Sequence, residues 1–119
     1  MYKRQLHRLL GIRPSSDREG CLQDIHWFTG LYGYFPSYSL GAMAAAQLMT
    51  AARQADGTID AALGRGDLGP LVAWLRRNVH AHGSRYGFAD LIEAATGETF
   101  DPTHFERHLR SRYLSGTPA

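Results

Sequence analysis

The side chains best suited to chemistry are concentrated between residues 20 and 38 of this 119-residue chain. Asp24 stands two positions before His26, so its carboxylate can hold one ring nitrogen and fix the imidazole tautomer. Gln23 precedes this pair and Trp27 follows it, which makes a polar cluster suited to contacting a substrate or supporting metal ligands. The structural alternative is that Asp24 caps a turn and that His26 is a buried, satisfied side chain. The residues alone leave both interpretations open.

Two tyrosines of the same segment carry hydroxyl groups that can donate hydrogen bonds. Tyr34 and Tyr38 are of the right type to donate to a substrate or to the oxyanion of a tetrahedral intermediate. Packing of both rings, with locally satisfied hydroxyls, is the competing interpretation. Gly33 and Pro36, on either side of Tyr34, are expected to set the backbone path that aims the two tyrosines.

Two pairs of histidines raise the question of a metal. His104 and His108 stand four residues apart on an expected helix, with Glu106 between them. In a zinc-peptidase His-Glu-x-x-His helix the glutamate directly follows the first histidine, about 100° around the axis, whereas Glu106 is about 200° around and faces away. We therefore expect ordinary surface histidines at these positions. His80 and His82 are expected to favour a helix end through the helix dipole.

Helices must position these groups, because apolar residues recur at helical spacing and no strand-like alternation competes. We expect an all-α fold of five to six helices, with an irregular loop rich in aromatic residues and glycine near residues 21–38. The helices are expected at residues 1–10, from 37 through the alanine-rich run to 52, and at 56–63, 67–80, 88–96 and 101–113. The alanines give the second helix a smooth side, which permits close approach of neighbouring helices.

Several residues mark the ends of these helices. Ser37 or Ser39 is the expected N-cap of the second helix, and Asp67 that of the fourth. Gly97 is expected to end the fifth helix in a left-handed conformation, and Asp101 followed by proline to start the last. Residues 1–114 are expected to form a single helical domain, and residues 115–119 a disordered tail.

Two adjacent motifs resemble those of the Taq-type thermostable metallocarboxypeptidases. Residues 20–27, Gly-Cys-Leu-Gln-Asp-Ile-His-Trp, resemble the family's G-x-x-Q-D-x-H-W motif. Residues 33–38, Gly-Tyr-Phe-Pro-Ser-Tyr, resemble its G-Y-F-P-T/S-Y motif. Leu-Gly at 40–41, Ala-Ala-Gln at 45–47 and Ala-Thr-Gly-Glu at 95–98 also look like the C-terminal region of that family. The resemblance covers essentially the whole chain, and two such motifs in the right order make a strong signal.

The family so implied is an α-helical, dimeric zinc or cobalt enzyme that removes C-terminal amino acids from peptides in a deep groove. The resemblance implies that Tyr34 donates to the oxyanion or the substrate, and that Tyr38, Gln23, Asp24 and His26 bind substrate. The family's metal is held by a His-Glu-x-x-His helix and a later glutamate upstream of this region, and the chain contains no such motif. We expect no metal bound by this chain, and no activity of the chain by itself, because nothing would then activate the attacking water.

The predicted function is that of a C-terminal domain or partial copy of a metal-dependent carboxypeptidase, which supplies substrate-side residues only. Its expected partners are the C-terminus of a peptide and either a metal-bearing portion or further copies of the chain. The alternative is a non-catalytic helical module that binds peptides or other proteins. Binding of a peptide without turnover would distinguish this alternative from an enzyme.

Charge and composition exclude other classes of function. Thirteen Lys and Arg against eleven Asp and Glu leave a net charge of +2, and the charges are interspersed, so no nucleic-acid partner is expected. No apolar stretch approaches the roughly 20 residues that cross a bilayer, so no membrane association is expected either. The single cysteine, Cys21, cannot form an internal disulfide, and the chain starts without the pattern of a signal peptide. These features indicate a cytoplasmic location.

Overall fold

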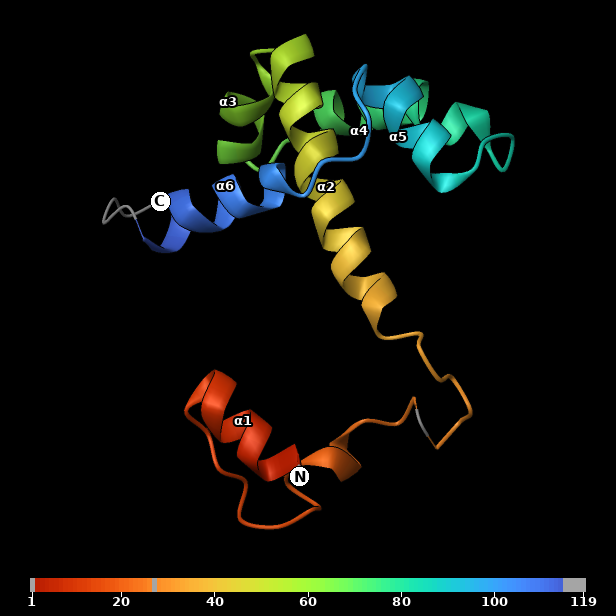
Figure 1. The fold of residues 1–119 in the computed structure, drawn as a ribbon. Helices are drawn as coiled ribbons and strands as arrows, with labels where there is room; N and C mark the ends of the chain where they lie inside the picture. Colours follow the sequence, from red (N-terminus) through yellow and green to blue (C-terminus); the bar gives the residue numbers. More distant parts are fainter. Residues whose placement is uncertain (1, 27, 115–119) are drawn as a thin grey trace. The chain divides into compact units, whose positions relative to one another are not determined.

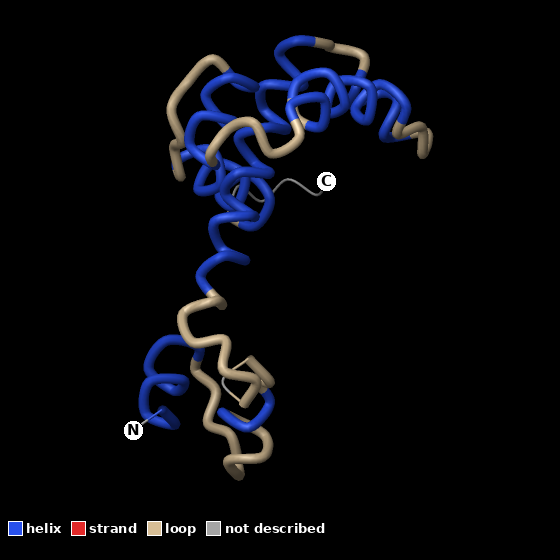
Figure 2. Tube along the Cα trace, turned by 90° about the vertical axis from the view of Figure 1, so that its right-hand side faces the viewer, coloured by secondary structure: helices blue, strands red, loops and turns tan. Residues whose placement is uncertain are grey.

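The computed structural model describes residues 2–26 and 28–114, and these ranges contain helices, turns and loops but no strand (Figures 1 and 2). The all-α expectation is therefore confirmed. Trp27 and the tail expected at 115–119 lie outside the described residues. Contacts group the chain into two compact units, Met1–Ser37 and Tyr38–Ala119, which are described in turn. That residues 1–114 behave as a single domain stays a prediction.

Six α-helices follow one another in the described ranges. They are α1 (Tyr2–Leu10), α2 (Pro36–Ala55), α3 (Ile59–Gly64), α4 (Gly69–Asn78), α5 (Phe88–Thr96) and α6 (Thr103–Tyr113), with single 3₁₀ turns η1 (Cys21–Gln23) and η2 (His80–His82). Helix α5 has the predicted bounds, and Gly97 ends it with a left-handed φ of 79°. Asp101 starts α6 as expected, since its carboxylate accepts the Thr103 N–H at 2.9 Å.

Two predicted helix starts were wrong, each for a local reason. Helix α2 begins at Pro36, so both candidate serine caps lie inside it; proline suits a first turn because its missing N–H is not needed there. Helix α3 begins at Ile59 rather than at Asp56, because the Asp56 carboxylate accepts the N–H of Thr58 at 2.9 Å and forms a turn instead. Asp67 starts α4 as Asp101 starts α6, since its carboxylate accepts the N–H of Gly69, the first residue of the helix, at 2.8 Å.

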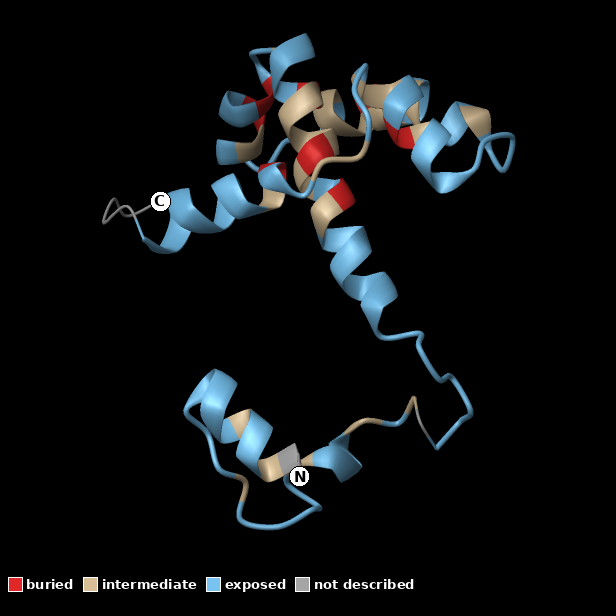
Figure 3. Ribbon diagram, in the orientation of Figure 1, coloured by how far each residue is buried: buried red, intermediate tan, exposed pale blue. Residues whose placement is uncertain are grey.

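In the described part of the first unit, local hydrogen bonds and an ion pair between Lys3 and Asp17 at 3.3 Å hold the segments. Helix α1 ends where the Gly11 N–H donates to the carbonyl of His7 at 3.0 Å, with a φ of 70° at the glycine. Among residues 3–26 and 28–37 none is fully buried (Figure 3). The irregular, aromatic-rich stretch predicted near 21–38 is present, interrupted only by η1 and by the start of α2.

The second unit has a small apolar core at which α2, α3 and α4 meet (Figures 1 and 3). Ala52 and Ile59 have no exposed surface, and Trp74 is 5% exposed. Seven partly buried apolar residues pack around them: Leu48, Ala51, Leu63, Leu71, Leu75, Val79 and Ala95. Burial of these side chains is the main driving force for association of the helices.

One buried polar residue ties α2 to the segment between α5 and α6. The Gln47 side chain is fully buried, and its amide nitrogen donates to the carbonyl of Thr99 at 3.0 Å. Its amide oxygen accepts the N–H of Asp101 at 2.9 Å. A buried amide satisfied in both directions fixes this connection in place, because leaving either group unpaired would be costly. None of the described helices is both long enough and apolar enough to span a bilayer.

Candidate substrate-side site

The centre of the candidate site is the contact between Asp24 and His26. One carboxylate oxygen of Asp24, Oδ1, lies 2.6 Å from His26 Nδ1 and also accepts the backbone N–H of His26 at 2.9 Å. A carboxylate can only accept, so Nδ1 carries the proton and a neutral ring has its lone pair on Nε2. The predicted fixing of the tautomer is present in the geometry. The same two bonds are also those of a turn cap, so the geometry does not separate the two interpretations.

These hydrogen bonds also affect the acidity of the carboxyl group. The backbone N–H of His26, followed by its ring N–H, holds the pKa of Asp24 below its ordinary value of 3.8. Hydrogen bonds donated to a carboxylate stabilise its charged form, which is why the direction is downward. Asp24 is therefore ionised at neutral pH and keeps the His26 ring in one orientation.

Two aromatic rings from the second motif lie against the His26 imidazole. The ring of Tyr34 is stacked on it, with centroids 5.5 Å apart and an interplanar angle of 21°. The ring of Phe35 meets it edge-on, also at 5.5 Å, with an angle of 84°. The imidazole is thus held by a carboxylate at one nitrogen and by rings on two sides. Sequence reasoning missed Phe35, and its position next to Tyr34 in the motif was the only signal for it.

A series of turns brings the two motifs together. The Leu31 N–H donates to the carbonyl of His26 at 2.8 Å, which closes the first turn. Gly30 and Gly33 have φ values of 78° and 74°, a region that glycine enters without steric cost, and this agrees with the expected role of Gly33. Beyond Tyr34, the Ser37 hydroxyl donates to the Tyr34 carbonyl at 2.6 Å. These turns bring the Tyr34 backbone close to His26.

Two further predicted residues have other surroundings described. The Gln23 side chain donates to the backbone carbonyl of Arg18 at 2.7 Å, a contact that stabilises the preceding turn. Tyr38 lies in the first turn of α2, at the start of the second unit, and its side chain is 54% exposed. The contacts described above join Asp24, His26 and Tyr34, and the roles assigned to all five predicted residues stay predictions.

The expectation that His104 is an ordinary surface histidine was wrong. Its side chain is only 6% exposed, and it lies against Glu98 of the α5–α6 connection. Arg107 Nη2 lies 3.0 Å from its Nδ1, so Nδ1 accepts and Nε2 bears the proton. Nε2 lies 2.6 Å from a carboxylate oxygen of Glu98, although the two are not aligned as a good hydrogen bond. His108 is exposed, as predicted.

The described residues do not fit a metal. A structural zinc site takes four protein ligands and a catalytic one takes three, whereas the nearest candidate, His104 with Glu98, offers two. Both nitrogens of that ring already face protein groups. No group of three or more His, Cys, Asp or Glu side chains suited to holding a metal occurs among residues 2–26 and 28–114.

Comparison with known proteins identifies relatives over nearly the full length of the chain. The family model for carboxypeptidase Taq (M32) metallopeptidases matches residues 1–113. Carboxypeptidase 1 of Bacillus subtilis is 42% identical over 113 residues, which are 95% of this chain and 23% of that protein. Thermostable carboxypeptidase 1 of Pyrococcus furiosus is 39% identical over 114 residues, 96% of this chain and 23% of the relative.

Solved structures give the same result. Metallocarboxypeptidase 1 of Trypanosoma cruzi has a TM-score of 0.88 at 43% identity, over 94% of this chain and 24% of that one. The M32 carboxypeptidase of Deinococcus radiodurans R1 has a TM-score of 0.87 at 37% identity, over 94% of this chain and 23% of that one. The chain therefore spans less than a quarter of the length of these relatives.

Proposed function

The chain belongs to the M32 family of metallocarboxypeptidases, and we propose that it supplies substrate-side hydrogen-bonding groups for removal of C-terminal amino acids from peptides. The observation that carries this proposal is the family match over residues 1–113 of a chain that spans only 23% of its relatives. The chain corresponds to a C-terminal-like part of the M32 fold, so the proposed role is a contribution to the site and not the complete reaction.

Each residue of the cluster has a distinct proposed role. Tyr34 donates its hydroxyl to the substrate carbonyl oxygen, on which negative charge develops when the peptide bond is attacked. His26 supports the Tyr34 ring by stacking, and Asp24 is a positioning residue that acts through His26. Gln23 offers its amide oxygen to a peptide N–H, since its nitrogen donates to the Arg18 carbonyl. Tyr38 contributes a second phenol.

The proposed partners follow from the same reasoning. The ligand is the C-terminus of a peptide, and the chain acts together with a metal-bearing portion of the fold or with further copies of itself. Exposed aromatic surface in the first unit supports such association, because Phe28 is 68% exposed and Tyr32 is 77% exposed. A cytoplasmic location is proposed from the single cysteine.

The first test is release of the C-terminal amino acid from an N-terminally blocked dipeptide by the purified chain. Zinc or cobalt is added, and a chelator-treated sample is the control. We expect no chelator-sensitive release, since the described residues offer no metal site. Chelator-sensitive turnover would contradict a purely substrate-side role, and it would direct attention to the histidines at 80, 82, 104 and 108.

A second test measures binding of the same dipeptide by NMR. Tyr34→Phe removes the hydroxyl but keeps the ring on His26, so we expect binding to weaken about tenfold, the value of roughly one hydrogen bond. Tyr32→Phe, in the same loop, is the matched control and is expected to leave the dissociation constant nearly unchanged. Equal binding by the wild type and the Tyr34 variant would favour the packing interpretation of that ring.

A further inference from the structure

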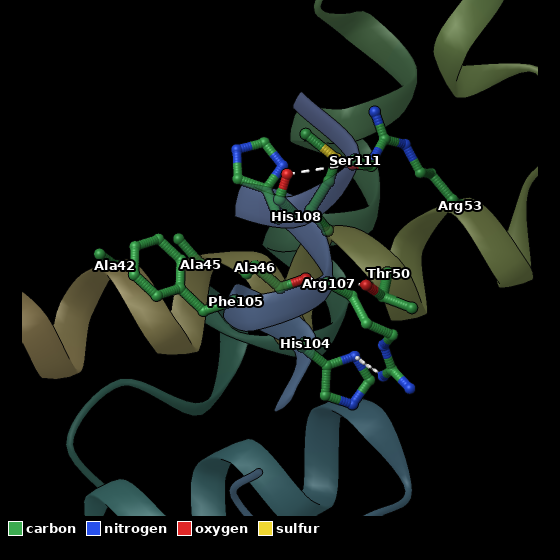
Figure 4. Close-up of a pocket in the computed structure, with 11 residues that line it drawn as sticks. Ala42, Ala45, Ala46, Thr50, Arg53, His104, Phe105, Arg107, His108 and Ser111 are labelled. Carbon is green, nitrogen blue, oxygen red and sulfur yellow. Dashed lines mark hydrogen bonds between the residues drawn. The ribbon is translucent and has the colours of Figure 1, made fainter. Parts of the chain in front are cut away.

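A cavity of about 600 Å³ lies between α2 and α6, entirely within the second unit (Figure 4). We call it the α2–α6 groove. Its α2 side is one helical face, because Ala42, Ala45, Ala46 and Met49 recur at spacings of three and four. The ring of Phe105 projects from α6 toward that face (Figure 4). The floor of the groove is therefore apolar.

The small side chains on this floor would allow another helix to pack closely against it. A helix approaches another to within about 8–10 Å, and the closest approaches need small residues at the contact. Ala42 and Ala45 are exposed, while Ala46, Met49 and Phe105 are half-buried, so α6 covers the face only in part. The smooth side predicted for this helix from its alanines is thus left open to a further element.

The rim of the groove is cationic. Its lining includes two arginines and two histidines but no aspartate or glutamate. Arg53 is partly neutralised by Asp60, whose Oδ1 lies 2.8 Å from its Nε. Arg107 instead contacts the uncharged acceptor nitrogen of His104; its charge acts on Asp101 from a distance, but no described carboxylate forms an ion pair with it. His108 on the same rim is exposed. A ligand with carboxylates would complement this edge.

We propose that the α2–α6 groove is a docking surface for an amphipathic helix with carboxylates along one edge, supplied by the portion of an M32 fold that this chain does not span. Two observations select this occupant. The relatives contain more than three quarters of their length outside the matched region, and an apolar floor with a cationic rim fits an acidic amphipathic helix. The proposal goes beyond the substrate-side function, because none of the groove residues belongs to the segment 20–38.

The test uses the full chain and synthetic peptides. Overlapping peptides of about 20 residues, long enough for roughly 30 Å of helix, cover the part of Bacillus subtilis carboxypeptidase 1 outside the matched region. Each is fluorescently labelled and titrated with the chain. We expect the peptides that bind to be acidic and amphipathic. Binding of basic peptides instead, or of no peptide, would overturn the proposal.

Variants locate the binding surface. Ala45→Glu adds bulk and negative charge to the floor, and Arg107→Gln removes the unpaired cation; each is expected to weaken binding about tenfold or more. Ala61→Glu on α3 and Arg112→Gln on α6 are exposed controls outside the groove and are expected to bind as the wild type does. Equal effects in both sets would overturn the assignment.

Light scattering provides a further check. If the wild type is an oligomer that Ala45→Glu dissociates, the groove binds a second copy of the chain, and the proposed occupant is overturned.

Discussion

The two units of the chain are stabilised by different means. Every described residue that is fully buried lies in the second unit, between Ala44 and His104. The first unit instead uses hydrogen bonds between residues close in sequence, such as the Leu31 N–H to the His26 carbonyl. The candidate chemical groups are thus carried by the part with the least burial of its own. Functional segments are commonly drawn from such less stable regions, with a rigid scaffold elsewhere.

The largest expected effect is on the core of the second unit. Trp74→Ala removes the largest side chain of the core cluster, which is 5% exposed. A truncation of this kind lowers the free energy of unfolding by about 3–5 kcal/mol. Phe28→Ala in the first unit is the control: its ring is 68% exposed, so we expect a change of about 0.5 kcal/mol or less. Urea denaturation followed by circular dichroism measures both. Similar decreases in the free energy of unfolding for the two variants would show that the two units do not differ in how side-chain burial stabilises them.

A smaller effect is expected at the buried amide of α2. Gln47→Leu leaves the Asp101 N–H and the Thr99 carbonyl without their partner, at a cost of about 2–3 kcal/mol. Gln54→Leu, at an exposed position of the same helix, is expected to have little effect. Hydrogen exchange at the Asp101 amide is the sharper measurement, since that N–H is the group released. Unchanged protection there would show that the amide bond does not hold the connection.

Two glycines with the same backbone conformation, one in each unit, allow the stability of the two units to be compared. Gly97 ends α5 with φ at 79°, and Gly33 precedes Tyr34 with φ at 74°. Nothing lies within 4 Å of a Cβ added at either position, so only backbone strain is tested. Gly97→Ala is expected to lower the free energy of unfolding by about 1 kcal/mol. Gly33→Ala is expected to change global stability little but to move the Tyr34 ring away from His26. The ring-current shift on the His26 protons in NMR reports that movement, and a Gly33 variant that keeps the shift would argue against backbone control of the ring.

Local signals in the sequence were sufficient for much of the fold. Helix α5 was predicted with its observed bounds. The glycine at 97, which adopts the left-handed conformation, directly follows the apolar pattern and marks the end of the helix. The Asp24–His26 contact was also predictable, since the two residues are separated by a single position. Where a turn competed with a helix start, as at Asp56, the sequence pattern did not show which hydrogen bond forms.

Features that depend on distant residues were not predictable. Helical spacing placed Gln47 on the same face as the apolar residues, but its partners at 96–101 lie about fifty positions away. His104 contacts Glu98 of the α5–α6 connection, and its burial could not be read from helical spacing alone. The stacking of Tyr34 on His26 depends on the combined path of several turns, which the sequence does not specify. Tertiary context decides such cases, and a sequence pattern carries no information about it.

The smallest expected effect concerns protonation of the candidate site. The backbone and ring N–H groups of His26 hold the pKa of Asp24 below 3.8, its value in an unfolded chain. A carboxyl with a lowered folded-state pKa contributes stability above the unfolded value and loses it as the pH falls through the folded value. The Asp24–His26 contact is therefore expected to persist at pH 4 and to be released at lower pH. The Asp24 side-chain carbon shift in NMR should titrate with a midpoint below 3.8.

Asp101 in the second unit provides the comparison, because the side chain and backbone of Thr103 lower its pKa in the same direction. Asp24→Asn removes the first transition and should leave the second. If Asp24 titrates at or above 3.8 while Asp101 titrates below it, the contact does not form in solution, and Tyr34 has no oriented imidazole to stack on.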